Sequence, residues 1–491
     1  MPTANTTAAA PSTRSTRMLP VILVAVFMAQ FDLYVVNVAL PVLQHDLSAS
    51  EPQLQMFVGG YAFTYAAGLI IGGKLGDHFG QRRMFMLGMI GFGVASLLCG
   101  LSLSASGLVV ARLLQGATAA AMVPQVLALI TATVAPADRP RALSWFGVTI
   151  GVGAVAGQVL GGLLLQADVA GLGWRVIFLI NVPIAVVTVA LAARAIPTLE
   201  RRVTARLDIV GAVGITASLG GVLLPLVVGR SQGWPVWSWV VLIAALPVMT
   251  GFALWERRLV RSGRAPILPP VLFAERAFNL GLGLSVILFS VFFSFVFTTS
   301  LVLQSGLGLD PLGAGLTFGP LGVAFAVASV GARPYVVKYG AKVIVTGALV
   351  VFFAMVAVIV LTSVRGGSLR PVELAIPMTA IGFGNGIAVP AVIGQVLARI
   401  QPSHAGAASG VLATAQQFSS ALGIAVIGGV FFVVLGRGAS AGDYTVALRA
   451  AAWVDLLLVV IGIALALRLA KTGRATPAAP TVQAAASAQP A

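Results

Sequence analysis

The sequence predicts an all-α membrane protein of fourteen transmembrane helices, arranged as two six-helix bundles with two additional helices between them. Of the 491 residues, 58% are hydrophobic and only 9% are charged, whereas about a quarter are charged in a soluble domain. Fourteen apolar runs follow one another, each close to the roughly 20 residues that a helix needs to cross a bilayer. Lys and Arg concentrate in alternate loops, as the positive-inside rule requires.

The first apolar run, about 18–40, follows a tail (1–17) that is rich in Thr, Ala, Ser and Pro and is predicted to be disordered. The run is too long for the core of a cleavable signal, so we interpret it as a retained span. A carboxylate in mid-span costs about 2.5–3.5 kcal/mol on insertion scales. Asp32 is therefore the first candidate for a proton site, and we expect it to face a central cavity. The alternative is a structural acid bonded to Arg112 or to a glutamine of a neighbouring span.

The other runs complete the two bundles. The N-terminal bundle covers 18–195, a segment with basic linkers and two further spans covers 196–276, and the C-terminal bundle covers 277–470. Residues 471–491 form a second tail that is predicted to be disordered. The thirteen runs after the first lie at about 54–74, 84–104, 107–133, 142–166, 174–195, 208–229, 236–256, 277–303, 312–335, 341–362, 372–397, 406–435 and 446–469.

The net charge of +16 comes mainly from loops on one side of the predicted topology. This distribution places both termini in the cytoplasm, predicts a multi-pass protein of the cell membrane and argues against a nucleic-acid partner. The single cysteine, Cys99, excludes an intrachain disulfide and a cysteine metal cluster. Because the sequence has no P-loop motif and no metal-ligand spacing, we expect no cofactor, no metal and no enzymatic activity. An ion gradient is the expected source of energy.

The loop after the second run reads Gly73-Lys-Leu-Gly-Asp77-His-Phe-Gly80-Gln-Arg82-Arg83. Glycines permit a tight turn between two helices, while one acid and two bases offer a charge clasp. The pattern resembles motif A of the major facilitator superfamily. The resemblance implies that Gly73, Asp77, Gly80, Arg82 and Arg83 form a latch that holds the cytoplasmic side closed. A plain solvated charge at Asp77 is the alternative.

The fourth run contains Arg112-Leu-Leu-Gln115-Gly, which resembles motif B of the same superfamily. The resemblance implies that Arg112 and Gln115, with Asn37 of the first run, belong to the cavity and to the proton-coupling machinery. Gln30 of the first run is a further candidate, which either lines the cavity or hydrogen-bonds between helices. Arg112 lies only about five residues inside its run. Its head group would therefore also be able to snorkel to the outer interface.

The fifth run contains Gly153-x-x-x-Gly157-Gln158-x-x-Gly161-Gly162, which resembles the antiporter motif C. Gln158 replaces the usual proline, but the glycines still form a face for close helix packing. The segment from Asp32 onward is similar to the first-span signature of the fourteen-span drug:proton antiporters (EmrB/QacA type). The resemblance covers about 18–470.

Other polar and aromatic residues within the runs are open to more than one interpretation. Asp455 is the other acid deep in a run and is a second candidate for proton coupling, although the last span usually lies at the periphery of this fold. Phe289 and Phe293 belong to an aromatic face, either for packing and lipid contact or for substrate. The glutamines of the C-terminal bundle either line the cavity or connect helices, namely Gln304, Gln416 and Gln417.

The resemblance implies efflux of hydrophobic or amphiphilic antibiotics or drugs by proton antiport, conferring resistance, with the chain acting as a monomer in the lipid bilayer. A proton-coupled metabolite transporter and a non-transporting membrane sensor are the alternatives. The Ala-, Val- and Arg-rich composition suggests a bacterium with GC-rich DNA, in which self-resistance to a secondary metabolite would be a natural role.

Overall fold

The computed structural model describes residues 13–135, 138–197, 208–229, 232–264, 266, 268–397, 400, 405–437 and 440–472. All regular secondary structure in these ranges is helical, and fourteen segments are long and apolar enough to cross a membrane. The predicted fold class and number of spans are thereby confirmed. Helices dominate because lipid offers no partner for backbone N–H and C=O groups, which a helix pairs internally.

The N-terminal bundle begins with a helix that is longer than predicted. Thr13–Arg17 contain no proline or glycine that would end a helix, so the expected disordered tail is wrong for these residues. Residues 1–12 lie outside the described ranges. The sixth span consists of two consecutive helices, and the six spans are α1 (Thr13–Asp46), α2 (Glu51–Phe79), α3 (Gln81–Gly100), α4 (Ala105–Thr133), α5 (Arg139–Ala167) and α6 with α7 (Val176–Leu179, Asn181–Ala195).

The C-terminal bundle repeats this order of six spans. Its first helix ends in a π-helical turn over Val302–Gly306, and a short helix, α13 (Arg333–Tyr339), links its second and third spans. The last helix ends two residues inside the predicted tail, of which 473–491 lie outside the described ranges. The spans are α11 (Arg276–Leu301), α12 (Pro311–Gly331), α14 (Lys342–Arg365), α15 (Pro371–Leu397), α16 (Ala405–Leu435) and α17 (Ala441–Thr472).

The two additional helices are α8 (Ile209–Leu224), which continues as a π-helical turn, and α9 (Val236–Arg261). α8 contacts both α2 and α16, and α9 packs on α8. The predicted basic linkers are partly helical, because α9 continues to Arg261 and α10 (Val271–Ala274) precedes α11. Residues 198–207 of the first linker lie outside the described ranges.

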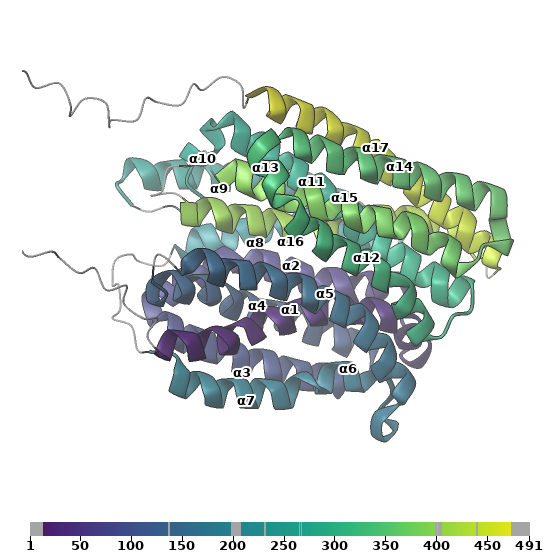
Figure 1. The fold of residues 1–491 in the computed structure, drawn as a ribbon, viewed down its shortest axis with the longest axis horizontal. Coiled ribbons are helices and arrows are strands. Elements are labelled where there is room, and N and C mark those ends of the chain that lie inside the picture. The colour runs from purple at the N-terminus through teal and green to yellow at the C-terminus, as the bar shows by residue number, and fades with distance from the viewer. Residues whose placement is uncertain are drawn as a thin grey trace, which may run out of the picture.

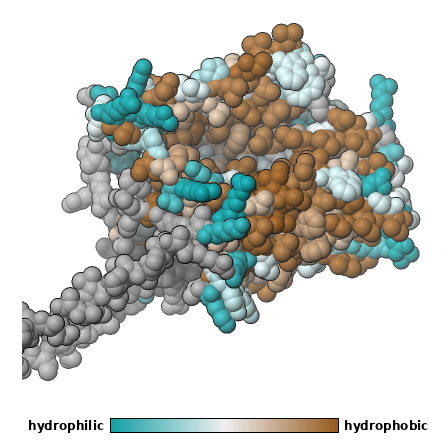
Figure 2. All heavy atoms as spheres, turned by 90° about the horizontal axis from the view of Figure 1, so that it is seen from above, coloured by the Kyte–Doolittle hydropathy of each residue, from teal (hydrophilic) through white to brown (hydrophobic). Residues whose placement is uncertain are grey.

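The bundles lie side by side, and an even number of spans brings both chain ends to the same end of the molecule (Figure 1). The bundles meet mainly where α2 packs on α16 and α5 on α12, and α1 also contacts α11 and α12. We call this contact the seam. Figure 2 shows apolar residues over the middle of one face and hydrophilic residues toward its ends, as a bilayer-spanning surface requires.

Candidate functional site

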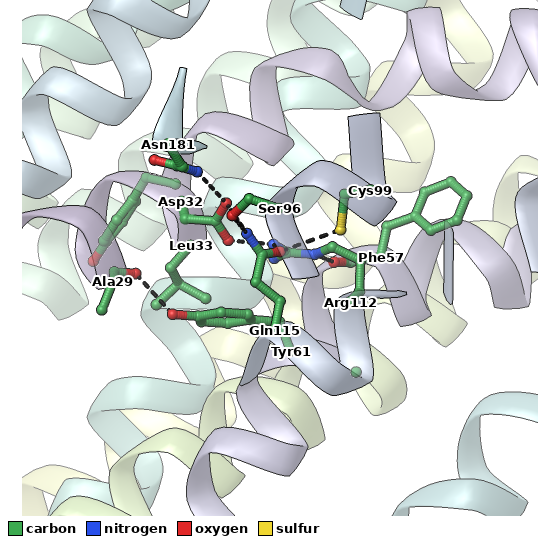
Figure 3. A network of polar contacts seen from close by, with 12 residues as sticks. Ala29, Asp32, Leu33, Phe57, Tyr61, Ser96, Cys99, Arg112, Gln115 and Asn181 are labelled. Carbon is green, nitrogen blue, oxygen red and sulfur yellow. Dashed lines mark hydrogen bonds and ion pairs between the residues drawn. The ribbon is translucent and has the colours of Figure 1, made fainter. Parts of the chain in front are cut away.

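Asp32 lies midway along α1 and is fully buried, with an exposed fraction of 0% (Figure 3). Its Oδ2 forms an ion pair with Nη1 of Arg112 on α4. Its Oδ1 accepts hydrogen bonds from Gln115 Nε2 at 2.8 Å and from Asn181 Nδ2 of α7 at 3.3 Å. Three donors therefore surround the carboxylate, which is the compensation that a charged acid requires in a protein interior.

Arg112 is buried as completely as Asp32. Its Nε donates to the Phe57 carbonyl at 2.7 Å, and its Nη1 also donates to Gln115 Oε1 at 2.6 Å. The guanidinium carbon lies 4.5 Å from the centre of the Tyr61 ring and 5.8 Å from that of Phe178, both within cation–π range. The alternative in which Arg112 snorkels to the outer interface is therefore wrong, since these contacts hold its head group inside the bundle.

Gln115 connects the ion pair to the third helix. Its amide nitrogen also donates to Ser96 Oγ at 2.8 Å, and its oxygen accepts from Cys99 Sγ at 3.4 Å. Sequence analysis did not select Ser96, Cys99 or Asn181 as site residues. Only Asn181 carried a usable signal, as an amide within an apolar run, because small residues such as Ser and Cys are common in buried helix contacts.

The expected position of Asp32 needs a correction. All its partners belong to the N-terminal bundle, so its side chain does not face a cavity between the bundles in this conformation. The neighbouring residue Tyr34 points to the seam instead, with its ring 5.4 Å from Phe293 and 6.5 Å from Phe292 of α11. Residues two apart on a helix point in different directions, and the sequence alone did not show which direction faces the seam.

The aromatic face of α11 lies at the seam. Phe289 stacks on Phe293 with ring centres 6.2 Å apart, and Phe292 lies 6.2 Å from Phe325 of α12. Phe292 and Phe293 are 8% and 3% exposed. In this conformation Phe293 and its neighbour Phe292 therefore pack within the protein and do not contact lipid, and a role of this face in substrate binding stays a prediction.

Polar groups also cross the seam near these rings. Gln304 Nε2 donates to Ser300 Oγ at 3.2 Å, and the Ser300 hydroxyl donates to the backbone carbonyl of Asn37. The amide nitrogen of Asn37 bonds back to its own helix, at 3.2 Å from Leu33 O. Gln416 and Gln417 lie on α16, where Gln417 is 8% exposed, and neither belongs to the Asp32 network.

Helix α5 packs against α1 through the motif C glycines. A Cβ atom added at Gly153, Gly157 or Gly161 would lie 2.7 to 3.0 Å from atoms of α1, including the Cβ of Gln30 beside Gly153, so no larger residue fits without a shift. Gly162 faces the start of α12 in the same way, at 2.4 Å. The side-chain amide of Gln158 is buried, and neither of its polar atoms has a hydrogen-bond partner among the described residues.

The residues of the predicted latch lie at the end of the molecule that carries the termini. Arg82 Nη2 donates to Ala193 O of α7 at 2.5 Å, a contact within the N-terminal bundle, and Arg83 is exposed. Gly80 separates α2 from α3 with a φ of +94°, where other residues are strained, and Gly73 lies about two helical turns before it. The latch function of these residues and of Asp77 stays a prediction.

Asp455 lies in the last helix and points inward to α11, although α17 is at the periphery of the bundle. The carboxyl group is 1% exposed, and its Oδ1 lies 3.0 Å from Ser294 Oγ. In the described part of the chain, its Oδ2 has no hydrogen-bond partner and no basic residue forms an ion pair with it.

Comparison with known proteins gives close relatives. The probable actinorhodin transporter of Streptomyces coelicolor is 36% identical over 88% of this chain and 75% of its own length. The tetracenomycin C resistance and export protein of Streptomyces glaucescens is 32% identical, over 82% and 74%. The puromycin resistance protein of Streptomyces alboniger is 33% identical, over 83% and 80%.

The same fold occurs in a solved structure of a bacterial homologue of the human lysosomal transporter Spinster. The TM-score is 0.67 at 17% identity, over 94% of this chain and 98% of that one. A sequence model of one family, the Major Facilitator Superfamily, matches residues 22–208 and 202–424. Together with the motifs and the two six-helix bundles, this match shows that the chain belongs to the major facilitator superfamily.

Proposed function

We propose that this protein exports apolar aromatic antibiotics across the cell membrane in exchange for protons and thereby confers resistance on its host cell. The buried Asp32–Arg112 pair carries the proposal, because protonation of its acid changes the charge of a fully buried site. The relatives named for actinorhodin, tetracenomycin C and puromycin support a small antibiotic as the substrate class.

Protonation of Asp32 would break the ion pair. The proton adds to a carboxylate oxygen and leaves a neutral acid, while Arg112 keeps its positive charge. A buried guanidinium without a counter-charge is unfavourable, so a conformation that gives Arg112 water or another acceptor becomes favoured. Loss of the proton restores the pair and the present conformation. Asp32 and Arg112 thus act as a two-state switch inside the N-terminal bundle.

Helix α1 connects this switch to the seam. It carries Asp32 toward the N-terminal bundle and Tyr34 toward α11. The glycine contact with α5 leaves α1 little room to move alone, so a change at Asp32 moves α1 and α5 together. Because α1 and α5 contact α11 and α12 at the seam, their joint movement shifts the N-terminal bundle against the C-terminal bundle. Inverted-repeat transporters alternate access by movements of this kind.

The seam supplies the expected substrate surface. The aromatic group of Tyr34, Phe289, Phe292 and Phe293 offers flat apolar contact, and the unpartnered amide of Gln158 offers a hydrogen-bond donor and acceptor. No charge is needed for such contacts. We therefore expect neutral aromatic compounds to be preferred over polycations.

The orientation follows from the positive-inside rule, with both termini in the cytoplasm. The motif A residues then lie on the cytoplasmic side, where Asp77, Arg82 and Arg83 act as the latch. Each proton that enters contributes about 1.4 kcal/mol per pH unit and roughly 2.3 kcal/mol per 100 mV of membrane potential. Both bundles lie in one chain, and we expect a monomer to be active.

Uptake into inverted membrane vesicles tests the proposal. The probes are actinorhodin, tetracenomycin C and puromycin, measured with an inward-acid pH gradient and after its collapse by an uncoupler. Wild type should accumulate at least one probe only with the gradient, and Asp32→Asn should abolish this dependence because the Asp32–Arg112 switch can then no longer respond to protons.

The matched control is Asp46→Asn, which removes an exposed acid at the end of the same helix and should leave uptake unchanged. Gradient-driven uptake that survives Asp32→Asn would remove the coupling role of Asp32. Wild-type uptake of every probe that ignores the uncoupler would contradict proton exchange itself.

A further inference from the structure

The C-terminal bundle contains a second buried acid that the proposed switch at Asp32 does not use. Asp455 of α17 faces Ser294 of α11, and both side chains are shielded from solvent, at 1% and 0% exposure. α11 also forms the seam with α1. The site therefore lies behind a helix that takes part in the contact between the two bundles.

A tightly packed glycine in the fourth span of each bundle gives the two bundles a common register. Gly116 of α4 lies eight residues before Pro124, and Gly382 of α15 lies eight residues before Pro390. A Cβ atom at Gly116 would lie 2.3 Å from a backbone oxygen of α2, and one at Gly382 would lie 2.1 Å from a backbone oxygen of α12. Each glycine thus holds the fourth span of its bundle against the second span.

In this register the polar partners of the first acid have apolar counterparts. Arg112 corresponds to Met378 and Gln115 to Ile381, and both counterparts are fully buried. The C-terminal bundle also contains a buried acid, Asp455, but on its sixth span instead of its first, and among the described residues no cation pairs with it. Another means of neutralising Asp455 is required, because an isolated buried carboxylate is strongly unfavourable.

The hydrogen-bond geometry of Ser294 supplies this means. Its Oγ lies 3.0 Å from the Val291 carbonyl and 3.0 Å from Asp455 Oδ1. A serine hydroxyl has one hydrogen, so it satisfies only one of two acceptors. Both contacts are hydrogen bonds when Ser294 donates to Val291 O and a protonated Asp455 donates to Ser294 Oγ.

No charged group within the described chain competes for this role. The titratable side chains on the helices packed against Asp455 lie toward the helix ends, and Arg449, on α17 itself, donates to Ser363 at 3.4 Å instead. The described part of α16 contains no titratable residue. The groups on α11, α14 and α17 are Arg276, Lys342, Arg365, Asp443, Tyr444, Arg449, Arg468 and Lys471.

A row of hydroxyl groups leads from Asp455 toward the end of the bundle that is opposite to the termini. Ser294 and Thr298 lie one turn apart on α11, and Thr298 Oγ1 donates to Ser294 O at 2.9 Å. One turn further, Leu301 lines an open pocket of about 220 Å³ between the two bundles, together with Gln44 of α1, Glu51 of α2 and Tyr444 of α17. The Thr298 hydroxyl thus lies between Asp455 and this pocket.

We propose that Asp455 and Ser294 form a second proton-binding site, which holds a proton in this conformation and exchanges it during transport. The proposal rests on the proposed proton-driven export. It gives the protein two proton sites, one in each bundle. The acid of the N-terminal bundle is paired with a cation, and the acid of the C-terminal bundle is neutralised by its own proton.

Infrared spectroscopy of the full chain in lipid nanodiscs at neutral pH tests whether the proton is held. Wild type should show the carbonyl stretching band of a protonated carboxylic acid, and Asp455→Asn should remove it. Ser294→Ala should shift the band without removing it, because the acid loses its acceptor. Asp46→Asn, the control at an exposed acid, should leave the band unchanged. A band that persists unaltered in Asp455→Asn would overturn the proposal.

Vesicle uptake at zero membrane potential, clamped with valinomycin and equal potassium, tests the exchange. One coupled proton supports about a tenfold probe gradient per pH unit and two support about a hundredfold gradient. Asp455→Asn should therefore lower the plateau ratio about tenfold per pH unit for the probe that wild type accumulates. An unchanged ratio would overturn the second site. Failure of proton-driven uptake in wild type would instead count against the proposed function, and the infrared result does not depend on it.

Discussion

Replacing Arg112 by methionine should destabilise the N-terminal bundle by about 3–5 kcal/mol, the usual effect of removing one partner of a buried ion pair. Methionine is the residue at the equivalent position of the C-terminal bundle, so its size suits the site. The substitution removes the ion pair and leaves Asp32 with only Gln115 and Asn181 as donors. It also removes the additional hydrogen bond from Arg112 Nε to the Phe57 carbonyl.

Unfolding in mixed micelles with increasing SDS measures this free energy, and a double-mutant cycle with Asp32→Asn isolates the pair. Because the double variant leaves no unpaired charge, it should be more stable than Arg112→Met alone, with a coupling energy of about 2 kcal/mol or more. Arg175→Met is the control. Its guanidinium lies 4.5 Å from the Trp174 ring and is partly exposed, so its loss should cost about 0.5–1 kcal/mol. Equal losses for the two arginine variants, with no coupling, would refute the reasoning.

Three further experiments test the packing and the seam. Gly116→Ala should destabilise by about 1–3 kcal/mol, since its Cβ would lie 2.3 Å from α2, whereas Gly147→Ala enters open space and should leave the unfolding temperature unchanged or slightly higher. Gln158→Leu should keep the unfolding temperature, because no hydrogen bond among the described residues is lost, but raise the KM for export. A double-mutant cycle of Tyr34→Leu and Phe293→Leu should give a coupling of about 0.5–1.5 kcal/mol, and zero coupling would exclude a contact across the seam.

The spans were predictable from the sequence because polar groups are costly in lipid, so each span is a long run of mostly apolar residues. The same energetic cost marked Asp32 and Asp455 as exceptional, whereas Arg112 was indicated by its resemblance to motif B. Helix ends were less predictable. Thr13–Arg17 are polar and resemble a tail by composition, yet nothing in them breaks a helix.

The partners within the site were only partly predictable. Arg112 was one of two named alternatives for Asp32, but the rotation of α1 that turns Asp32 away from the seam depends on contacts with α4 and α7. Such contacts join residues about 80 and 150 positions apart, as for Asp32 with Arg112 and Asn181. No local pattern encodes them. Ser96 has even less signal, because its role appears only once Gln115 is placed beside it.

Because of the two additional helices, the two edges of the seam differ in how they face the lipid. One edge of the seam, α2 with α16, borders α8, which contacts both helices. The other edge, α5 with α12, presents exposed apolar side chains such as Leu160, Leu163, Leu316 and Val323. An apolar drug concentrates in the bilayer before it meets the transporter. Such a molecule therefore diffuses directly to the α5–α12 edge, while α8 and α9 stand between it and the α2–α16 edge, which gives recruitment from the lipid a preferred side.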